Sequence, residues 1–158
     1  MNEEYEFFWS GPFSQWYGSR FVIDGIPFVT AEQWMMFGKA KLFGDDDIAA
    51  KILLTTNPKE QKAIGRQVKN FNAKIWDDYA KTIVYEGNYA KFTQNPKLLV
   101  ILMDTKYKIL VEASPYDKIW GIGMGEEQAK ITPANKWLGT NWLGEVLTQL
   151  RNDLKNGS

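Results

Sequence analysis

The sequence lacks both cysteine and histidine across its 158 residues. Without cysteine the chain has no disulfides, thiolate nucleophiles or zinc–thiolate centres. Without histidine it also lacks the side chain that most often serves as a general base near neutral pH and as a transition-metal ligand. Any catalysis must therefore use Asp, Glu, Lys, Arg, Tyr, Ser or Thr. No spaced carboxylate loop typical of Mg²⁺ or Ca²⁺ is present, so we expect no metal and no cofactor.

An excess of charge of one sign is also lacking, because 19 basic residues balance 19 acidic ones. The absence of a basic run disfavours sequence-independent binding to nucleic acid, whereas a small phosphorylated ligand needs only one or two cations. No apolar run approaches the roughly 20 residues of a membrane-spanning helix. The start, MNEEYEFFWSG, is acidic where a secretory signal would be basic. We therefore expect a cytoplasmic protein without a membrane partner.

The residues that are present indicate an ordinary globular protein. Hydrophobic residues make up 44% of the chain and charged residues 24%, and the length suits one domain spanning residues 1–158. Aromatic residues are abundant, at 15% with seven tryptophans. They could fill the core, or they could offer stacking surfaces to the planar rings of a ligand.

Short strands are predicted from local patterns. Residues 5–9 (YEFFW) and 107–113 each fit one strand, and residues 20–29 fit a hairpin with Asp24-Gly25 as its turn signal. The remaining regular structure is helical, so the predicted fold class is a mainly α, multihelical single domain with a small β-sheet.

The first predicted helix begins near Ala31, because Thr30 and Gln33 have the spacing of a capping box, and it ends at Gly44-Asp45. The helix from Asn95 is strongly apolar and should be buried on several sides. Asn141 is expected to cap the closing helix. The further helices are predicted at 45–55, 58–68, 73–88, 95–105 and 141–155.

The first predicted helix carries a candidate acid and a candidate amine. Glu32 and Lys39 are seven residues apart, which is about two helical turns, so they share a face. In the structural alternative, Glu32 only complements the helix dipole and Lys39 is solvated. Met35 and Met36, with the neighbouring Trp34, are better explained as core residues than as a ligand surface.

The second candidate region is the segment EASPYDKIWGIG. Glu112 ends an apolar strand, where a carboxylate needs partners or a raised pKa, as many catalytic acids do. It could equally be a structural acid bonded to backbone amides. Asp117 lies in a turn, where Asp is common as a local backbone acceptor. Trp120 could stack on a base or pack in the core.

Further candidates lie outside these two regions. Trp9 and Ser10 belong to the segment WSGPFSQW, which suits a rigid loop that presents aromatic and hydroxyl groups, although ordinary packing would explain it too. Arg66 and Arg20 are candidate phosphate ligands, with an exposed structural arginine as the alternative for each.

Six phrases occur in an order and spacing that resemble the YbiA-like family, also called the NADAR (NAD- and ADP-ribose-associated) domain family. The resemblance runs from about residue 7 to residue 152. It departs mildly at Gly18, where proline is common, and at Trp34, where tyrosine is usual. The phrases are FWSGPFSQWY (8–17), FVTAEQWMMFGKAKLFGD (28–45), IGRQV (64–68), KFTQN (91–95), LVEASPYDKIWGIG (110–123) and WLGTNWLGEVL (137–147).

The resemblance implies a mainly α-helical fold and N-glycosidase activity. Some family members cleave ribose 5-phosphate from the aminopyrimidine of early riboflavin-pathway intermediates, and others remove ADP-ribose from modified guanine in nucleic acid. In both substrate groups the ribose C1 carries an exocyclic nitrogen. Hydrolysis of this C1–N bond needs carboxylates together with a proton donor or an amine. It does not need histidine, cysteine or a metal.

The resemblance also implies functional residues. The acid and lysine of the family's first motif correspond to Glu32 and Lys39, and its E-A-S-P-x-D-x-x-W-G phrase corresponds to Glu112, Asp117 and Trp120. Our hypothesis makes Lys39 the nucleophile or proton donor at C1. Glu112 or Asp117 would be the base and cation stabiliser, and Glu32 would orient Lys39 or bind ribose hydroxyls. The expected substrate-binding residues are Trp120, Trp9, Ser10, Arg66, Arg20 and Asn141.

The leading hypothesis is therefore hydrolysis of free ribosylaminopyrimidine phosphates, since a nucleic-acid strand would favour a positive groove. The first alternative is an ADP-ribosyl-guanine hydrolase acting on DNA or RNA, because a flipped base can be bound locally. The second is a module that binds NAD or ADP-ribose without turning it over, although pure binding would not require an acid–amine set. A purely structural role for every aromatic residue is the least favoured.

Overall fold

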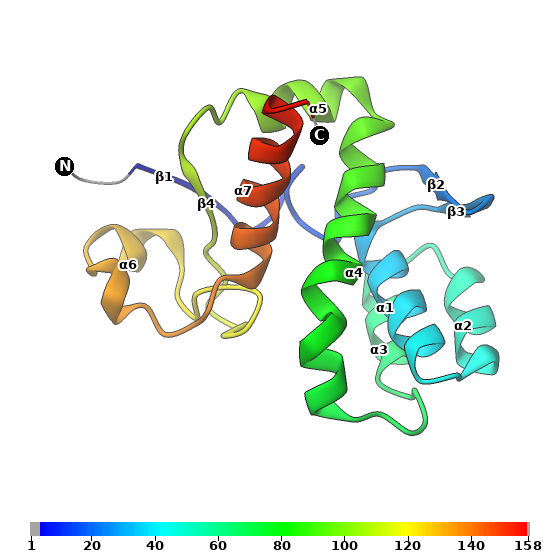
Figure 1. Ribbon diagram of the computed structural model, residues 1–158. Helices are drawn as coiled ribbons and strands as arrows, with labels where there is room; N and C mark the ends of the chain where they lie inside the picture. Colours follow the sequence, from blue (N-terminus) through cyan, green and yellow to red (C-terminus); the bar gives the residue numbers. More distant parts are fainter. Residues whose placement is uncertain (1–3, 158) are drawn as a thin grey trace. The chain divides into compact units, whose positions relative to one another are not determined.

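The computed structural model describes residues 4–157, and Figure 1 shows their helices and strands. The chain divides into two compact units. The central unit is Gln15–Pro96, and the terminal unit comprises the segments within Met1–Ser14 and Lys97–Ser158. The single domain expected over residues 1–158 stays a prediction. The predicted fold class, mainly helical with little sheet, is confirmed.

The central unit is a four-helix arrangement with one hairpin. Helix α1 packs against each of the other three helices, and β2 packs against α4. Figure 1 shows α1, α2 and α3 grouped beside the lower half of the long α4. The elements are β2 (Phe21–Ile23), β3 (Ile26–Phe28), α1 (Ala31–Leu42), α2 (Asp46–Leu53), α3 (Pro58–Gly65) and α4 (Ala73–Thr93).

The hairpin forms where the turn signal predicted it. Asp24 and Gly25 both have positive φ, 52° and 79°, as a two-residue turn joining twisted strands requires. The antiparallel register pairs Phe21 with Phe28. Both rings are buried, and they stack with their centroids 5.7 Å apart. The turn therefore fixes the register that puts these aromatic rings in the core.

The predicted start of α1 is confirmed. The hydroxyl of Thr30 accepts the N–H of Gln33 at 3.0 Å. Gln33 Oε1 accepts the N–H of Val29 at 2.9 Å, one residue before the cap. Together these bonds satisfy donors that a helix N-terminus would otherwise leave unpaired.

Helix α4 is longer than predicted, because it runs to Thr93 rather than to residue 88. Gly87-Asn88 is a poor helix-forming pair by propensity, but packing decides here. A Cβ at Gly87 would lie 2.3 Å from the Trp34 ring, so the glycine makes room for the indole. The indole N–H of Trp34 then donates to the Ile83 carbonyl at 2.7 Å, which fixes the ring against α4.

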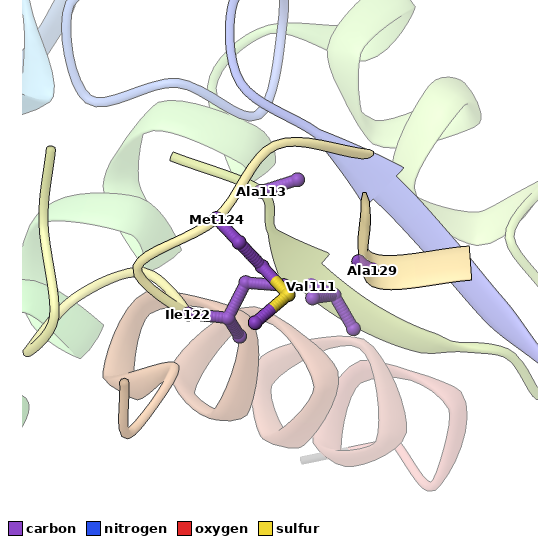
Figure 2. Close-up of a cluster of buried hydrophobic side chains, with 5 residues drawn as sticks. All are labelled: Val111, Ala113, Ile122, Met124 and Ala129. Atoms are coloured by element: carbon purple, nitrogen blue, oxygen red, sulfur yellow. The ribbon is translucent and has the colours of Figure 1, made fainter. Parts of the chain in front are cut away.

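The terminal unit is built on two parallel strands. Strand β1 (Tyr5–Phe8) pairs with β4 (Ile109–Glu112), and both strands lie within the ranges predicted at 5–9 and 107–113. Helix α7 (Trp142–Lys155) packs on β4. Figure 2 shows the core cluster beside this sheet, in which Ile122 and Met124 meet residues of β4 and α6. The cluster is Val111, Ala113, Ile122, Met124 and Ala129.

One prediction in this unit needs correction, and two short helices need to be added. Helix α5 (Pro96–Met103) is not buried on several sides, because Val100 is 59% exposed and only Leu98 and Leu102 are buried. Apolar content therefore overstated its burial. Helix α6 (Glu126–Lys130) and the short 3₁₀ helix η1 (Ala134–Lys136) were not predicted, since each is too short to show a period. Within residues 4–157, every helix is too short or too polar to span a bilayer.

Candidate active site

Helix α1 brings an acid and an amine together in the central unit. Glu32, in the first turn, is 6% exposed, and Lys39 is half-buried two turns later. Burial lowers the pKa of Lys39 below its usual 10.5; the Glu32 carboxylate opposes this by raising it, and Arg66 lowers it further. The predicted shared face is therefore present, and both charges influence the Lys39 amine.

Arg66 and Arg20 occupy different surroundings in the central unit. Arg66 is exposed and occupies the C-terminal cap position of α3. Its positive charge lowers the pKa of Lys39. Arg20 is exposed just before β2, and its carbonyl accepts the side-chain amide of Asn95 at 2.9 Å. Arg66 is thus the stronger candidate for a phosphate held near the amine.

Sequence reasoning missed Phe71, which contacts the Lys39 amine. The amine nitrogen of Lys39 lies 4.7 Å from the centroid of the Phe71 ring, a distance at which a cation is attracted to the ring face. Phe71 is 46% exposed and packs edge-on against Phe43. It follows Asn70, whose φ is 62°. A lone Phe in a polar loop gave no periodic signal, so only the fold reveals this contact.

Lys91 is a second lysine whose environment sequence reasoning did not reveal. It is 0% exposed in α4, and burial lowers its pKa to about 7. The ring centroids of Tyr17 and Phe92 lie 5.8 Å and 5.0 Å from its amine nitrogen. Lys91 continues the buried stripe formed by Ala80, Val84 and Asn88. Extending the helical period beyond residue 88 would have found it.

In the terminal unit, Glu112 lies at the end of β4, where its backbone is fully engaged. Its N–H donates to Asn141 Oδ1 at 2.9 Å, and its carbonyl accepts the N–H of Ile122 at 3.0 Å. The carboxylate lies over the backbone of Gly121, where an added Cβ would be 3.2 Å from Oε2. The side chain is therefore partly buried at a strand end, as expected.

Asp117 shapes the turn that carries Trp120. Its Oδ1 accepts the N–H groups of Ile119 and Trp120 at 2.9 Å and 2.8 Å. The ring of Trp120 is half-buried and meets Trp142 edge-to-face, with centroids 5.5 Å apart. One carboxylate oxygen of Asp117 therefore has a structural task, which was the alternative considered for it.

Asn141 lies at the predicted cap position of α7 but does not cap the helix with its side chain. Its φ is 55°, in the left-handed region, and the side chain makes no capping bond. Instead Oδ1 accepts the Glu112 N–H, and Nδ2 donates to the Leu110 carbonyl at 3.0 Å. The prediction of a cap is wrong, because the side-chain amide instead makes two hydrogen bonds with the backbone of β4. Gly144 leaves room for it, since a Cβ there would meet the amide at 2.3 Å.

Replacing Asn141 should destabilise the terminal unit. Asn141→Ala leaves the Glu112 N–H and the Leu110 carbonyl without these partners, which should cost about 2–3 kcal/mol. Asn141→Gly should cost about 1 kcal/mol less than Asn141→Ala, because glycine adopts positive φ without strain. Urea unfolding measures both. Equal stability of Asn141→Ala and the wild type would contradict the bridging role.

Trp9 and Ser10 are exposed just after β1 in the terminal unit. The Trp9 ring is 51% exposed, and its centroid lies 5.7 Å from that of Tyr116, which is 84% exposed. This tilted pair leaves ring faces open to solvent. Tyr116 was not predicted as a site residue, although it lies inside the EASPYDKIWG phrase.

The structure thus forms two groups of candidate residues, each connected within its own unit. In the central unit, Glu32 and Arg66 both shift the pKa of Lys39, whose amine nitrogen lies 4.7 Å from the Phe71 ring. In the terminal unit, Glu112 connects to Asn141, and Asp117 to Trp120. Among residues 4–157, no three acidic side chains come together as a metal site would need.

An acid, an amine of lowered pKa and open aromatic rings are the groups that N-glycoside hydrolysis can use. The chain is 48% identical to N-glycosidase R617 of Acanthamoeba polyphaga mimivirus over 146 residues, which are 89% of this chain and 86% of that one. It is 43% identical to Protein irg-1 of Caenorhabditis elegans, over 82% of this chain and 62% of that one. The NMR structure of the Escherichia coli protein YbiA matches with a TM-score of 0.80 and 25% identity, covering 99% of this chain and 88% of that one.

The class defined by this fold and these relatives is the N-glycosyl hydrolases. The NADAR domain model matches residues 7–155, nearly the whole chain. The chain belongs to the NADAR domain family, which confirms the resemblance found in its sequence.

Proposed function

We propose that the chain is a cytoplasmic N-glycosidase that hydrolyses the ribose C1–N bond of ribosylaminopyrimidine 5′-phosphates, the early intermediates of riboflavin synthesis. The observation that carries the proposal is the Glu32–Lys39 pair of α1, with Arg66 close enough to shift the same amine. A chloroplastic riboflavin biosynthesis protein of Zea mays supports the substrate class. It is 35% identical over 68% of this chain, which corresponds to 16% of that protein.

Lys39 is suited to either role that the reaction offers an amine. Its lowered pKa increases the fraction of free amine near neutral pH, which a nucleophile needs. Glu32 counteracts this shift and so preserves some ammonium, which a proton donor needs. An open-ring route has the amine attack C1 of the imine form, and a closed-ring route has the ammonium protonate the departing nitrogen.

The other groups would bind and stabilise the substrate. Arg66 suits the 5′-phosphate, because a guanidinium matches phosphate oxygens in two-point contact. Phe71 offers a ring to the aminopyrimidine beside the amine. The sequence hypothesis for the acids of the EASPYDKIWGIG segment stays a proposal, with Glu112 or Asp117 as base and cation stabiliser. Asp117, with one oxygen engaged by its turn, would contribute through the other.

The roles of the remaining predicted binding residues stay those that the sequence hypothesis gave them. Trp120 and Trp9 would stack on the planar ring, and Ser10 would bind through its hydroxyl. Arg20 is a weaker candidate for the phosphate than Arg66, because it lies before β2. Asn141 would act through Glu112, whose backbone N–H it binds.

The test is a side-by-side assay of the purified protein with two substrates. One arm uses a ribosylaminopyrimidine 5′-phosphate, and the other uses an oligonucleotide carrying ADP-ribosyl guanine. We expect kcat/KM for the free metabolite to exceed that for the oligonucleotide by at least about tenfold, since the balanced charge gives a strand little attraction. Preference for the oligonucleotide would make ADP-ribosyl-guanine the substrate. Binding of ADP-ribose with turnover of neither substrate would make the chain a binding module.

A further inference from the structure

Gln15 connects two helices of the central unit, α1 and α4. Its side-chain carbonyl accepts the amide N–H of Asn88 on α4 at 2.9 Å. Its backbone carbonyl accepts the N–H of Glu32 on α1, also at 2.9 Å. Its own amide points to Met35 Sδ at 3.9 Å. Residues 15, 32 and 88 therefore form one continuous chain of contacts in the interior of this unit.

The bond to Glu32 matters because of where it lies in α1. Glu32 is the second residue of the helix, so its N–H has no partner within the helix. The Gln15 carbonyl supplies that partner, while the Thr30 hydroxyl serves the next N–H, that of Gln33. The position of the turn that carries the Glu32 carboxylate therefore depends on Gln15.

Asn88 holds Gln15 at a cost to stability. It is 0% exposed, and its Nδ2 also donates to the Val84 carbonyl at 2.9 Å. Within the described residues, its Oδ1 is buried without a hydrogen-bond partner. A buried amide oxygen without a donor costs about 1–3 kcal/mol. A contribution to stability therefore does not explain why position 88 carries an amide. The hydrogen bond that Nδ2 donates to Gln15 explains it instead.

We propose that Asn88 is a positioning residue for Glu32, which it acts on through Gln15. The bond fixes the first turn of α1, and with it the placement of the Glu32 carboxylate relative to the Lys39 amine. This inference rests on the proposed function, in which that acid and that amine act as a pair. Asn88 itself contacts no reacting group.

The consequence can be observed on Lys39. The charged groups that shift the pKa of Lys39 are Glu32 on α1 and Arg66 after α3, and Glu32 is the one that raises it. When Asn88 is replaced by leucine, Gln15 loses its donor and the Glu32 turn loosens. The pKa of Lys39 should then fall further, because its stabilising carboxylate is less well placed. A merely structural role for Asn88 would not move this pKa.

The test compares Asn88→Leu with Asn95→Leu. Asn95 is the control, because its Nδ2 also donates two hydrogen bonds, here to the backbone carbonyls of Arg20 and Lys91, and none to Gln15. The readouts are kcat and KM, and the pKa of Lys39 from the pH dependence of its acylation followed by peptide mass spectrometry. In Asn88→Leu we expect kcat to fall about 10- to 100-fold, KM to change less than threefold and the Lys39 pKa to fall. Asn95→Leu should keep the wild-type kcat and Lys39 pKa.

Three outcomes decide the inference. A folded Asn88→Leu variant with an unchanged Lys39 pKa and unchanged kcat overturns it. If Asn88→Leu does not fold, Gln15→Met removes the same bond from its other end, and it should lower the Lys39 pKa and kcat in the same way. An unchanged pKa and kcat there also overturns the inference. Failure of the proposed function looks different: Lys39→Met would then retain activity, whatever Asn88→Leu does to the pKa.

Discussion

Lys39→Met is expected to lower kcat by about 10²–10⁴-fold, the range found when a positioned proton donor or nucleophile is removed. Methionine keeps most of the side-chain volume and the contact with Phe71, so the fold should persist. The loss should appear in kcat more than in KM, because the amine acts on C1 in the transition state. Steady-state kinetics with the ribosylaminopyrimidine phosphate measures it.

The matched control for this variant is Lys41→Met. Lys41 lies two residues further along the same helix, is exposed and pairs with Asp46 at 2.9 Å. It should keep the wild-type kcat, since a surface ion pair contributes little. If Lys39→Met had the same kcat as Lys41→Met, Lys39 would play no part in the chemistry.

Borohydride treatment during turnover separates the two routes for Lys39. In the open-ring route, the amine forms a bond to C1 and the base leaves with a proton. Water then releases ribose 5-phosphate and restores the amine. Reduction of the imine in this route leaves a stable adduct on the Lys39 peptide, and the closed-ring route leaves none.

Lys91→Met is expected to stabilise the protein by about 2 kcal/mol at pH 6, which raises the Tm by about 4–8 °C for a chain of this length. Burial disfavours the ammonium form of Lys91, whose pKa is lowered to about 7. Methionine fills similar volume without a charge to desolvate. Thermal unfolding followed by circular dichroism measures the difference.

The pH dependence of this effect has a definite sign. The unfolded chain holds the lysine proton up to about pH 10.5, whereas the folded chain releases it near pH 7. Between these values the unfolded state binds more protons, so wild-type stability gains from this group as pH rises. The advantage of Lys91→Met should therefore be largest below pH 7 and shrink toward pH 10.

Lys74→Met, on the exposed start of α4, should change stability by less than about 0.5 kcal/mol at any pH. Destabilisation of Lys91→Met at pH 6 would contradict a net cost of burying this amine.

The parts of the fold that were predictable are those with local causes. The Asp24-Gly25 hairpin and the Thr30 cap depend on residues within four positions of one another, and each occurs as expected. The shared face of Glu32 and Lys39 follows from helical geometry alone. The family phrases added the roles of these residues, which composition could not supply.

The rest depended on contacts between residues far apart in the sequence. Asn141 was expected to cap α7, but its amide serves β4, about 30 residues away. Phe71 reaches Lys39 from a loop with no periodic pattern. Lys91 lies on a helix face that the Gly87-Asn88 pair made easy to end too early. In each case tertiary packing overrode the local signal.

The proposed use of Glu32 and Lys39 in N-glycoside hydrolysis is tested by a single-turnover measurement with the wild-type enzyme in excess over ribosylaminopyrimidine 5′-phosphate, beside the Glu32→Gln/Lys39→Met double variant. We expect the wild type to release ribose 5-phosphate and aminopyrimidine in equal amounts until the substrate is consumed, and the double variant to release neither above the uncatalysed rate. Intact substrate recovered from the wild type, or equal release by both proteins, would contradict it.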